Sequence, residues 1–298
     1  MKKISIIVLH YNGEKNTIVC LKSIKNLVAH DVIILPMVVD NASQKKFVAS
    51  SVKVLRSEEN LGFAGGNNIG IKNSLEQKSD YILILNNDTV VDENLIKELL
   101  VVMERDERIG IVSPKIYFEK GHEYHKTRYH SSELGKVIWY AGGIMDHKNI
   151  IGSHRGVDEV DHGQFDRLEE TDFATGCCML VRKEVFREIG FLDEKYFLYY
   201  EDNDFCRRAW KAGFKIMYAP KAIIWHKNAG SAGGSGSNLQ DYYITRNRLL
   251  YGIRYESFRS KLSLLRESVK FLFNGRYWQK RGVLDFYRGA FKKGSYFL

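Results

Sequence analysis

Short apolar runs alternate with helical patterns along the first part of the chain. The runs are rich in Ile, Val and Leu without polar alternation, and they cover residues 4–9, 32–39, 52–55 and 81–85. Strands of this kind are buried on both faces, as in parallel sheets. The intervening helical patterns cover residues 15–27, 66–77 and 93–104. The alternation predicts an α/β fold with a Rossmann-like, mostly parallel sheet flanked by helices, which binds ligands at the carboxyl ends of its strands.

The rest of the chain is less regular. Residues 116–170 have weak periodicity, and we expect loops and short strands that cover one side of a site. A strand is predicted at 177–181, followed by helices at 183–188 and 202–212, each with a glycine suited to a helix stop. Residues 229–238 are rich in Gly and Ser. This segment is interpreted as a lid over a bound ligand or, alternatively, as a passive linker.

The net charge of +9 is concentrated near the C-terminus. Residues 246–298 contain thirteen Lys and Arg, three acidic residues and many aromatic residues, whereas the remainder is nearly neutral. We therefore expect a globular domain over residues 1–245 and a basic, aromatic-rich helical extension over residues 246–298. Such helices suit an anionic membrane surface, or they pack on the domain with their charges in water. No nucleic-acid-binding motif accompanies the charge, so nucleic acid is not an expected partner.

The chain has no apolar run near the roughly 18 residues that a membrane-spanning helix needs. Its first apolar run is interpreted as a buried strand rather than a signal peptide, because His10, Tyr11 and Asn12 follow it. The cysteines form no Cys-x-x-Cys pair, which favours reduced and buried thiols. These features predict a cytoplasmic location, and the basic extension suggests peripheral contact with the inner face of the plasma membrane.

Five polar clusters stand at or just beyond the ends of predicted strands. They are Asp40-Asn41-Ala42-Ser43, the glycine-rich stretch from Glu59 to Gly70, Asn86-Asn87-Asp88-Thr89, Glu201-Asp202-Asn203-Asp204 and Trp225-His226. Because ligands of such sheets bind where the strands end, we expect the clusters to surround one pocket.

Each cluster alone allows a chemical and a structural interpretation. Asp40 could accept hydrogen bonds from a base or ribose, or Asp40 or Ser43 could cap a following helix. A helix that begins near Gly66 could present free N–H groups to an anion. Asp88 could hold Mg²⁺ or Mn²⁺ against a diphosphate, or it could belong to a simple turn. One acid of the Glu201–Asp204 cluster, with its pKa raised by its neighbours, could be a general base, or Asp202 and Asp204 could be a helix cap and a first-turn charge.

In this order, the clusters resemble the inverting family 2 glycosyltransferases of the GT-A fold, particularly the rhamnosyltransferase-like branch. The resemblance covers about residues 3–250 and also includes Thr175-Gly176. The ordered set is far more specific than any single motif. One departure is Asn86, where many members have Asp, so the expected metal site holds one carboxylate fewer.

The resemblance implies a role for each matched residue. Asp202 would be the catalytic base, and Asp88 with His226 would ligate the divalent metal. The acceptor would lie beside Thr175, Gly176 and Glu201. The nucleotide sugar would contact Leu9, Tyr11, Asn12, Asp40, Asn41, Asn60, Gly62, Phe63, Gly66, Asn67, Asn87 and Asp88.

The implied reaction transfers a sugar, with inversion, from dTDP-rhamnose or a UDP-hexose to a hydroxyl of a saccharide or lipid-linked saccharide. The setting would be the synthesis of bacterial cell-surface polysaccharide. A non-catalytic sugar-nucleotide-binding or scaffold protein on the same fold is the alternative, and the presence of both Asp88 and Asp202 argues against it. A nucleotidyltransferase is disfavoured, because residues 10–14 provide no basic phosphate loop. The sequence identifies neither the donor sugar nor the acceptor.

Overall fold

The computed structural model describes residues 1–298 except 30, 126, 228–235 and 297–298, so most of the predicted lid or linker lies outside the described residues. The described strands are β1 (Lys2–His10), β2 (Val32–Asn41), β3 (Lys53–Ser57), β4 (Tyr81–Asn86), β5 (Thr89–Val91), β6 (Ile109–Phe118), β7 (Ile138–Tyr140), β8 (Gly143–Asp146), β9 (Ile151–His154), β10 (Glu169–Glu170), β11 (Cys178–Arg182) and β12 (Lys215–His226). The described helices are α1 (Glu14–Lys25), α2 (Gly62–Glu76), α3 (Leu95–Met103), α4 (Lys183–Ile189), α5 (Glu201–Lys211), α6 (Asn238–Tyr255), α7 (Phe258–Asn274) and α8 (Tyr277–Arg288).

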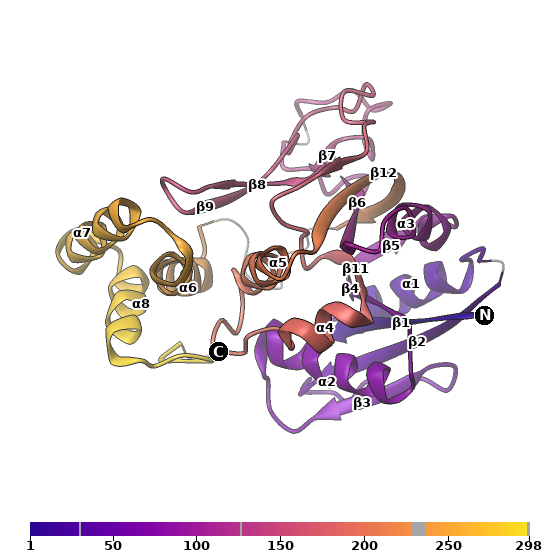
Figure 1. The fold of residues 1–298 in the computed structure, drawn as a ribbon, viewed down its shortest axis with the longest axis horizontal. Helices are drawn as coiled ribbons and strands as arrows, with labels where there is room; N and C mark the ends of the chain where they lie inside the picture. Colours follow the sequence, from indigo (N-terminus) through magenta and orange to yellow (C-terminus); the bar gives the residue numbers. More distant parts are fainter. Residues whose placement is uncertain (30, 126, 228–235, 297–298) are drawn as a thin grey trace.

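One large sheet forms the core, with the strand order β10-β12-β6-β11-β4-β1-β2-β3 (Figure 1). The four strands predicted in the first part of the chain pair in parallel, which confirms that part of the expected sheet. β11 instead runs antiparallel to both neighbours, β4 and β6. The irregular region 116–170 contains the short strands that were expected, including the separate β8–β9 hairpin.

The register of the sheet brings the predicted clusters to one edge. His10 at the end of β1 pairs with Asp40 of β2, and Leu9 pairs with Asn86 at the end of β4. Because β11 runs in the opposite direction, the residues just before it, 175–177, lie at this same edge. The site therefore lies at the edge formed by the carboxyl ends of β1, β2 and β4 and the residues just before β11. We call this edge the platform.

The chain turns back after β4 and forms β5, which pairs with the end of β12 and so places that end at the platform. β5 pairs antiparallel with the end of β12, so that Thr89 stands opposite His226. Asp88 lies in the turn immediately before Thr89. Two clusters that are far apart in sequence thereby become neighbours.

The glycine-rich stretch serves close packing of α2 on β1. A Cβ at Gly66 would come within 2.5 Å of Leu9 Cδ1, and one at Gly70 within 2.6 Å of Ile7 Cγ2. The helix begins at Gly62, so the expectation of a helix start near Gly66 is wrong. Two N–H groups of its first turn are already hydrogen-bonded, because Gly62 donates to Asn60 Oδ1 and Phe63 donates to the Phe197 carbonyl.

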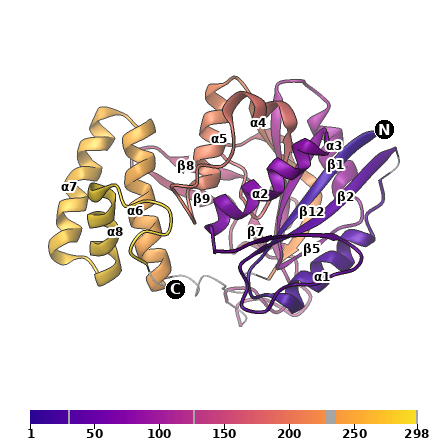
Figure 2. The same ribbon diagram turned by 90° about the horizontal axis from the view of Figure 1, so that it is seen from below.

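The basic extension is helical, as expected, and lies beside α5 at one end of the molecule (Figures 1 and 2). The boundary expected between residues 245 and 246 falls inside the continuous helix α6. Arg246 is the largest fully buried side chain among the described residues, and Leu249, Leu250 and Tyr251 are also buried. None of the described helices has the length and apolar character needed to cross a membrane.

The turn after β2 is organised around Asp40. Its fully buried carboxylate accepts hydrogen bonds from the backbone N–H groups of Ser43 (2.9 Å) and Phe47 (3.0 Å) and pairs with Arg56. Burial alone would raise the pKa of this carboxyl, but these hydrogen bonds prevail and lower it below its ordinary value. Asp40 therefore orders the turn after β2, whereas the alternative expectation that it caps a following helix is wrong, because residues 42–52 form no helix.

We predict that Asp40→Asn lowers the free energy of unfolding by about 1–3 kcal/mol, because the buried amide cannot accept from all three donors. Urea unfolding without nucleotide measures this effect. Glu14→Gln is the matched control, since Glu14 pairs with Lys45 at the exposed surface and should change stability by less than about 0.5 kcal/mol. Equal stability of the Asp40→Asn variant and the parent would contradict the structural role of Asp40.

Candidate active site

Asp88 and His226 meet at the platform, as their predicted role as metal ligands requires. Asp88 Oδ1 lies 3.1 Å from His226 Nε2, across 138 residues of sequence. Burial raises the pKa of the Asp88 carboxyl, but His226 and Lys227 outweigh this effect and hold the pKa below its usual value. The carboxylate is thus kept ionised, which is the form that binds a cation.

The donor set fits one divalent ion. Two ligands about 2.1 Å from an octahedral ion and at right angles to each other stand roughly 3 Å apart, close to the separation of Asp88 Oδ1 and His226 Nε2. Oxygen and imidazole nitrogen both suit Mn²⁺. Across the described parts of the chain, no three His, Cys, Asp or Glu side chains gather into a complete metal cluster. The remaining ligands of the ion would therefore not be His, Cys, Asp or Glu side chains of the described residues.

Two aromatic residues behind His226 were not identified from the sequence. Trp139 packs edge-to-face on His226, with ring centroids 4.6 Å apart, and on His154 at 4.3 Å. Burial lowers the pKa of His154 to about 4, so this ring is neutral. The His226 ring is consequently held by packing from the irregular region, whose weak periodicity hid these contacts.

Asp202 stands in the first turn of α5, at the platform. Its Oδ2 accepts a hydrogen bond from the Gly176 N–H at 3.0 Å, and its Oδ1 accepts from the backbone N–H (2.8 Å) and side-chain amide (3.0 Å) of Asn203. Burial raises the pKa of the Asp202 carboxyl above its ordinary value, and these hydrogen bonds offset only part of that effect. The side chain is partly exposed, so this carboxylate can reach a ligand.

Its two acidic neighbours have different environments. Asp204 is fully buried and accepts from the hydroxyl groups of Tyr196 and Tyr255 and from Arg208 and Arg254. The Glu201 carboxyl is also buried, but its Oε2 has no hydrogen-bond partner. Burial, with Asp202 and Asp204 nearby, raises the pKa of Glu201 well above its ordinary value. Asp202 is therefore the acid of the three that is available to act as a base at the platform.

The predicted nucleotide-binding residues fall into two groups. Asn41 ties the glycine-rich turn to β2, because its amide donates to the Gly62 carbonyl (2.9 Å) and accepts from the Leu61 N–H (3.0 Å). Asn60 accepts from the Gly62 N–H at 2.9 Å. Residues that are exposed or partly exposed at the platform are Leu9, Tyr11, Asn12, Asn60, Phe63, Asn87 and Asp88, whereas Asp40, Asn41, Gly62, Gly66 and Asn67 are buried.

Phe63 connects the residues predicted to bind the nucleotide sugar with those predicted to lie beside the acceptor. A Cβ at Gly176 would lie only 2.8 Å from the Phe63 ring and 3.8 Å from Asp202 Cβ, so these three residues are in close contact. The next residue, Cys177, accepts the Asn86 N–H at 2.9 Å. The clusters thus form a contiguous platform, with Thr175 buried beneath it.

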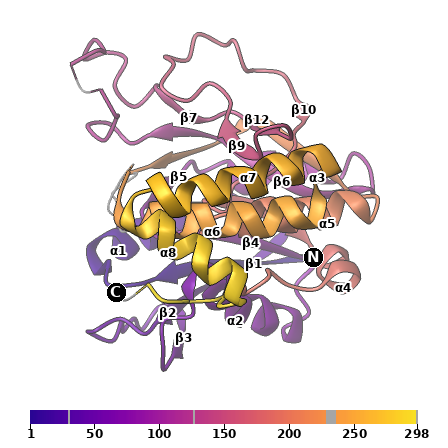
Figure 3. The same ribbon diagram turned by 90° about the vertical axis from the view of Figure 1, so that its left-hand side faces the viewer.

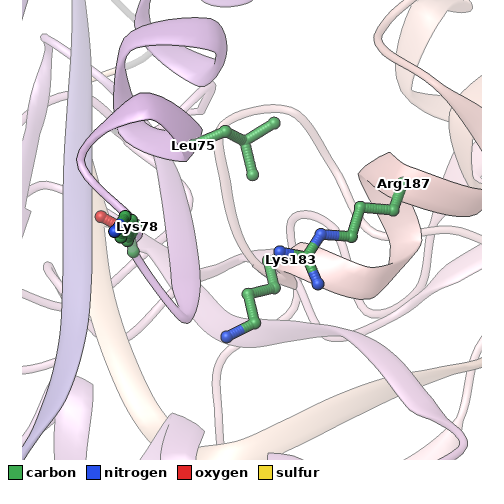
Figure 4. Close-up of a pocket in the computed structure, with 5 residues that line it drawn as sticks. Leu75, Lys78, Lys183 and Arg187 are labelled. Carbon is green, nitrogen blue, oxygen red and sulfur yellow. The ribbon is translucent and has the colours of Figure 1, made fainter.

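A cavity of about 360 Å³ lies away from this platform, lined by Leu75, Lys78, Ser79, Lys183 and Arg187 (Figure 4). Lys183 follows β11 and pairs with Asp80 at 2.6 Å, at the start of β4. The cavity therefore opens at the opposite edge of the sheet and contains none of the predicted site residues.

Known proteins are similar to this chain in sequence and in fold. The chain is 28% identical over 253 residues to the low-salt glycan biosynthesis hexosyltransferase Agl10 of Haloferax volcanii, covering 83% of this chain and 74% of the relative. It is also 28% identical over 196 residues to N-acetylglucosaminyl-diphospho-decaprenol L-rhamnosyltransferase of Mycobacterium tuberculosis, covering 61% of each chain. The dTDP-rhamnosyl transferase RfbF of Shigella flexneri is 26% identical over 199 residues, which is 64% of this chain and 60% of the relative.

Solved structures confirm the expected GT-A architecture. GalNAc-T7, solved with UDP, GalNAc and Mn²⁺, superimposes with a TM-score of 0.61 at 16% identity, covering 96% of this chain and 57% of that one. The mannosyltransferase PcManGT of Pyrobaculum calidifontis, in complex with GDP-Man and Mn²⁺, gives 0.54 at 12% identity, covering 99% and 76%. Residues 5–190, more than half of the chain, match the family described as Glycosyl transferase family 2. This protein therefore belongs to glycosyl transferase family 2.

Proposed function

We propose that this enzyme transfers a sugar, with inversion, from a nucleoside-diphosphate sugar to a hydroxyl of a saccharide or lipid-linked saccharide. The observation that carries the proposal is the Asp202 carboxylate at the same platform as the Asp88–His226 pair. Asp202 is suited to removing a proton, and the Asp88–His226 pair is suited to holding a metal-bound diphosphate. The relatives named as rhamnosyltransferases and hexosyltransferases favour dTDP-rhamnose or a UDP-hexose as the donor.

The chemistry at Asp202 is a single in-line displacement. As the acceptor oxygen forms a bond to the anomeric carbon, Asp202 accepts the proton of that hydroxyl. The bond between the anomeric carbon and the diphosphate oxygen breaks on the opposite face, and the nucleoside diphosphate leaves with the electron pair. The raised pKa of Asp202 makes it a stronger base than an ordinary aspartate.

Asp88 and His226 would hold a divalent metal beside the diphosphate. A bound Mg²⁺ or Mn²⁺ supplies neutralisation of the negative charge that develops on the leaving group. The solved structures with Mn²⁺ and a nucleotide or nucleotide sugar support this assignment. Tyr11, Asn12, Asn60 and Phe63, which stand exposed or partly exposed around the platform, would contact the nucleotide sugar.

Helix α7 would bring the site to an anionic lipid surface. It is the outermost helix of the C-terminal group, on the side away from the sheet (Figures 1 and 3). Its exposed apolar residues Phe258, Leu262, Val269 and Phe273 lie within about 60° of arc at 100° per residue. The exposed cationic residues Arg259, Arg266 and Lys270 lie along one side of this stripe. An apolar stripe bordered by cations suits a bilayer with negative headgroups.

Asp202→Asn should lower turnover by about 10²–10⁴-fold while leaving donor affinity unchanged, because proton acceptance is lost and the side-chain volume is kept. A thermal-shift screen with dTDP- and UDP-sugars and Mn²⁺ selects the donor. Release of nucleoside diphosphate from that donor, with water as acceptor, measures turnover, and calorimetry measures donor affinity. Parental turnover in Asp202→Asn would remove this residue from the role of base.

The proposed role of Asp202 as the base also predicts that activity depends on pH. Because Asp202 must be deprotonated, activity should fall as the pH drops through its pKa, which lies above the ordinary 3.8. Asn203→Ala removes a hydrogen bond that favours the charged form. The acidic limb of the kcat/KM profile should then move upward by about one pH unit, equivalent to about 1.4 kcal/mol. An unmoved limb would assign that limb to another group.

Asp88→Ala should remove the effect of metal on nucleotide binding. Calorimetry with UDP or dTDP, in Mn²⁺ or in EDTA, should show tighter binding with metal in the parent by about tenfold or more, or about 1.4 kcal/mol. The two conditions should give equal affinities in Asp88→Ala. Glu93→Ala is the matched control, because Glu93 is an exposed carboxylate near the same turn. A metal effect retained in Asp88→Ala would contradict the site.

Phe258→Ser combined with Phe273→Ser should weaken binding to phosphatidylglycerol-containing vesicles by about tenfold or more, since each phenylalanine contributes about 1.5–3 kcal/mol when buried. Co-sedimentation measures the bound fraction, with phosphatidylcholine vesicles as the uncharged comparison. Val101→Ser changes an exposed apolar residue on α3 and serves as the control. Equal pelleting of both variants and the parent would reject α7 as the lipid-binding face.

A further inference from the structure

The loop that leads into α5 has an unusual backbone. Phe197, Tyr199 and Tyr200 all have positive φ, at 64°, 68° and 71°. Residues with a Cβ disfavour this left-handed region by roughly 1–2 kcal/mol each. Such a conformation persists only where the surroundings enforce it. The loop ends at Tyr200, so its shape sets the direction in which Glu201 and Asp202 enter the platform.

The enforcing contacts come from α6, in the C-terminal extension. Asn247 is fully buried, and its amide nitrogen lies 2.8 Å from each of three loop carbonyls, those of Tyr196, Leu198 and Tyr199. Its amide oxygen accepts from Arg246 Nε at 3.0 Å, which defines the orientation of the amide. A single side chain therefore gathers three backbone carbonyls of the left-handed loop.

Arg246 reinforces the same loop. Its buried guanidinium donates to the carbonyls of Lys195 (3.2 Å) and Tyr196 (3.0 Å), and on its other side to that of Lys292 (2.8 Å). Arg246 thereby connects the loop to the C-terminal segment after α8. The Tyr196 carbonyl is a buried acceptor, so loss of its donors would leave it unsatisfied.

The loop also touches the nucleotide side of the platform. The Phe197 carbonyl accepts the Phe63 N–H at 2.6 Å, and a Cβ at Gly62 would lie 2.3 Å from that same oxygen. Phe63 in turn packs on Gly176, whose N–H holds Asp202. The loop is thus the shared support of the glycine-rich turn and the proposed base.

We propose that Asn247, with Arg246, is a positioning residue that holds the 196–200 loop in its left-handed form and so aims Asp202 at the acceptor hydroxyl. The inference rests on the proposed function of Asp202 as base. It makes α6 part of the catalytic architecture, although the helix contributes no group to the reaction.

Asn247→Asp tests the inference, because it keeps the side-chain shape and the acceptor for Arg246 but replaces the amide donor with oxygen. We expect kcat for nucleoside diphosphate release, with the selected donor and Mn²⁺, to fall by about 10²-fold with donor affinity unchanged. Hydrogen exchange should rise in residues 195–201 and not in the central sheet. Asn247→Ala, which adds no charge, provides the same measurements if the Asp variant does not fold.

Arg248→Gln is the matched control on the same helix. Arg248 donates to Glu267 and the Asn149 carbonyl and, among the described residues, to none of the loop carbonyls, so its loss should loosen the C-terminal helices and leave kcat unchanged. In combination with Asp202→Asn, the Asn247 change should cost no further activity if it acts through that carboxylate. A fully additive double variant, or parental kcat and loop exchange in both Asn247 variants, would overturn the inference. Retained turnover in Asp202→Asn alone would instead reject the proposed base.

Discussion

The structure depends on the register of parallel pairing at the centre of the sheet. β1 pairs with β2 on one side and β4 on the other, so the ends of all three strands stop together. Polar residues that would be costly inside the sheet are thus collected at one edge, where the backbone turns. Every proposed role depends on this edge, because a shift of one residue would turn each side chain to the other face of the sheet.

Three adjacent acids show how environment, rather than residue type, assigns a role. Asp204 has four protein donors and ties α5 to the Tyr196 loop and to α6. Glu201 is buried with an unpaired oxygen, and burial raises its pKa strongly. Asp202 combines a raised pKa with partial exposure. The pattern Glu-Asp-x-Asp thus provides one structural acid and one group suited to proton transfer.

The sequence left open whether the C-terminal extension packs on the domain or meets a membrane, and the structure shows that part of it packs on the domain. α6 packs on the catalytic domain through Arg246, Asn247 and a buried apolar cluster. α7 turns an apolar stripe outward, with cations beside it. A basic, aromatic-rich composition therefore does not separate the buried face from the exposed face, because composition does not state which side chains meet the domain.

The sequence alone predicted the features that local patterns encode. Apolar runs indicated the four parallel strands, and the ordered clusters, through their resemblance to a known family, indicated the fold, the Asp88–His226 pair and the candidate base. Tertiary structure alone decided the antiparallel insertion of β11, the burial of Asp40 against Arg56, and the packing role of Gly66. It also revealed the contacts between the Asn247 amide and the backbone carbonyls of the 196–200 loop, which are 48 to 51 residues away along the chain. The reason is physical: periodicity reports which face of an element is buried, whereas pairing direction and polar partners depend on contacts between residues distant in sequence.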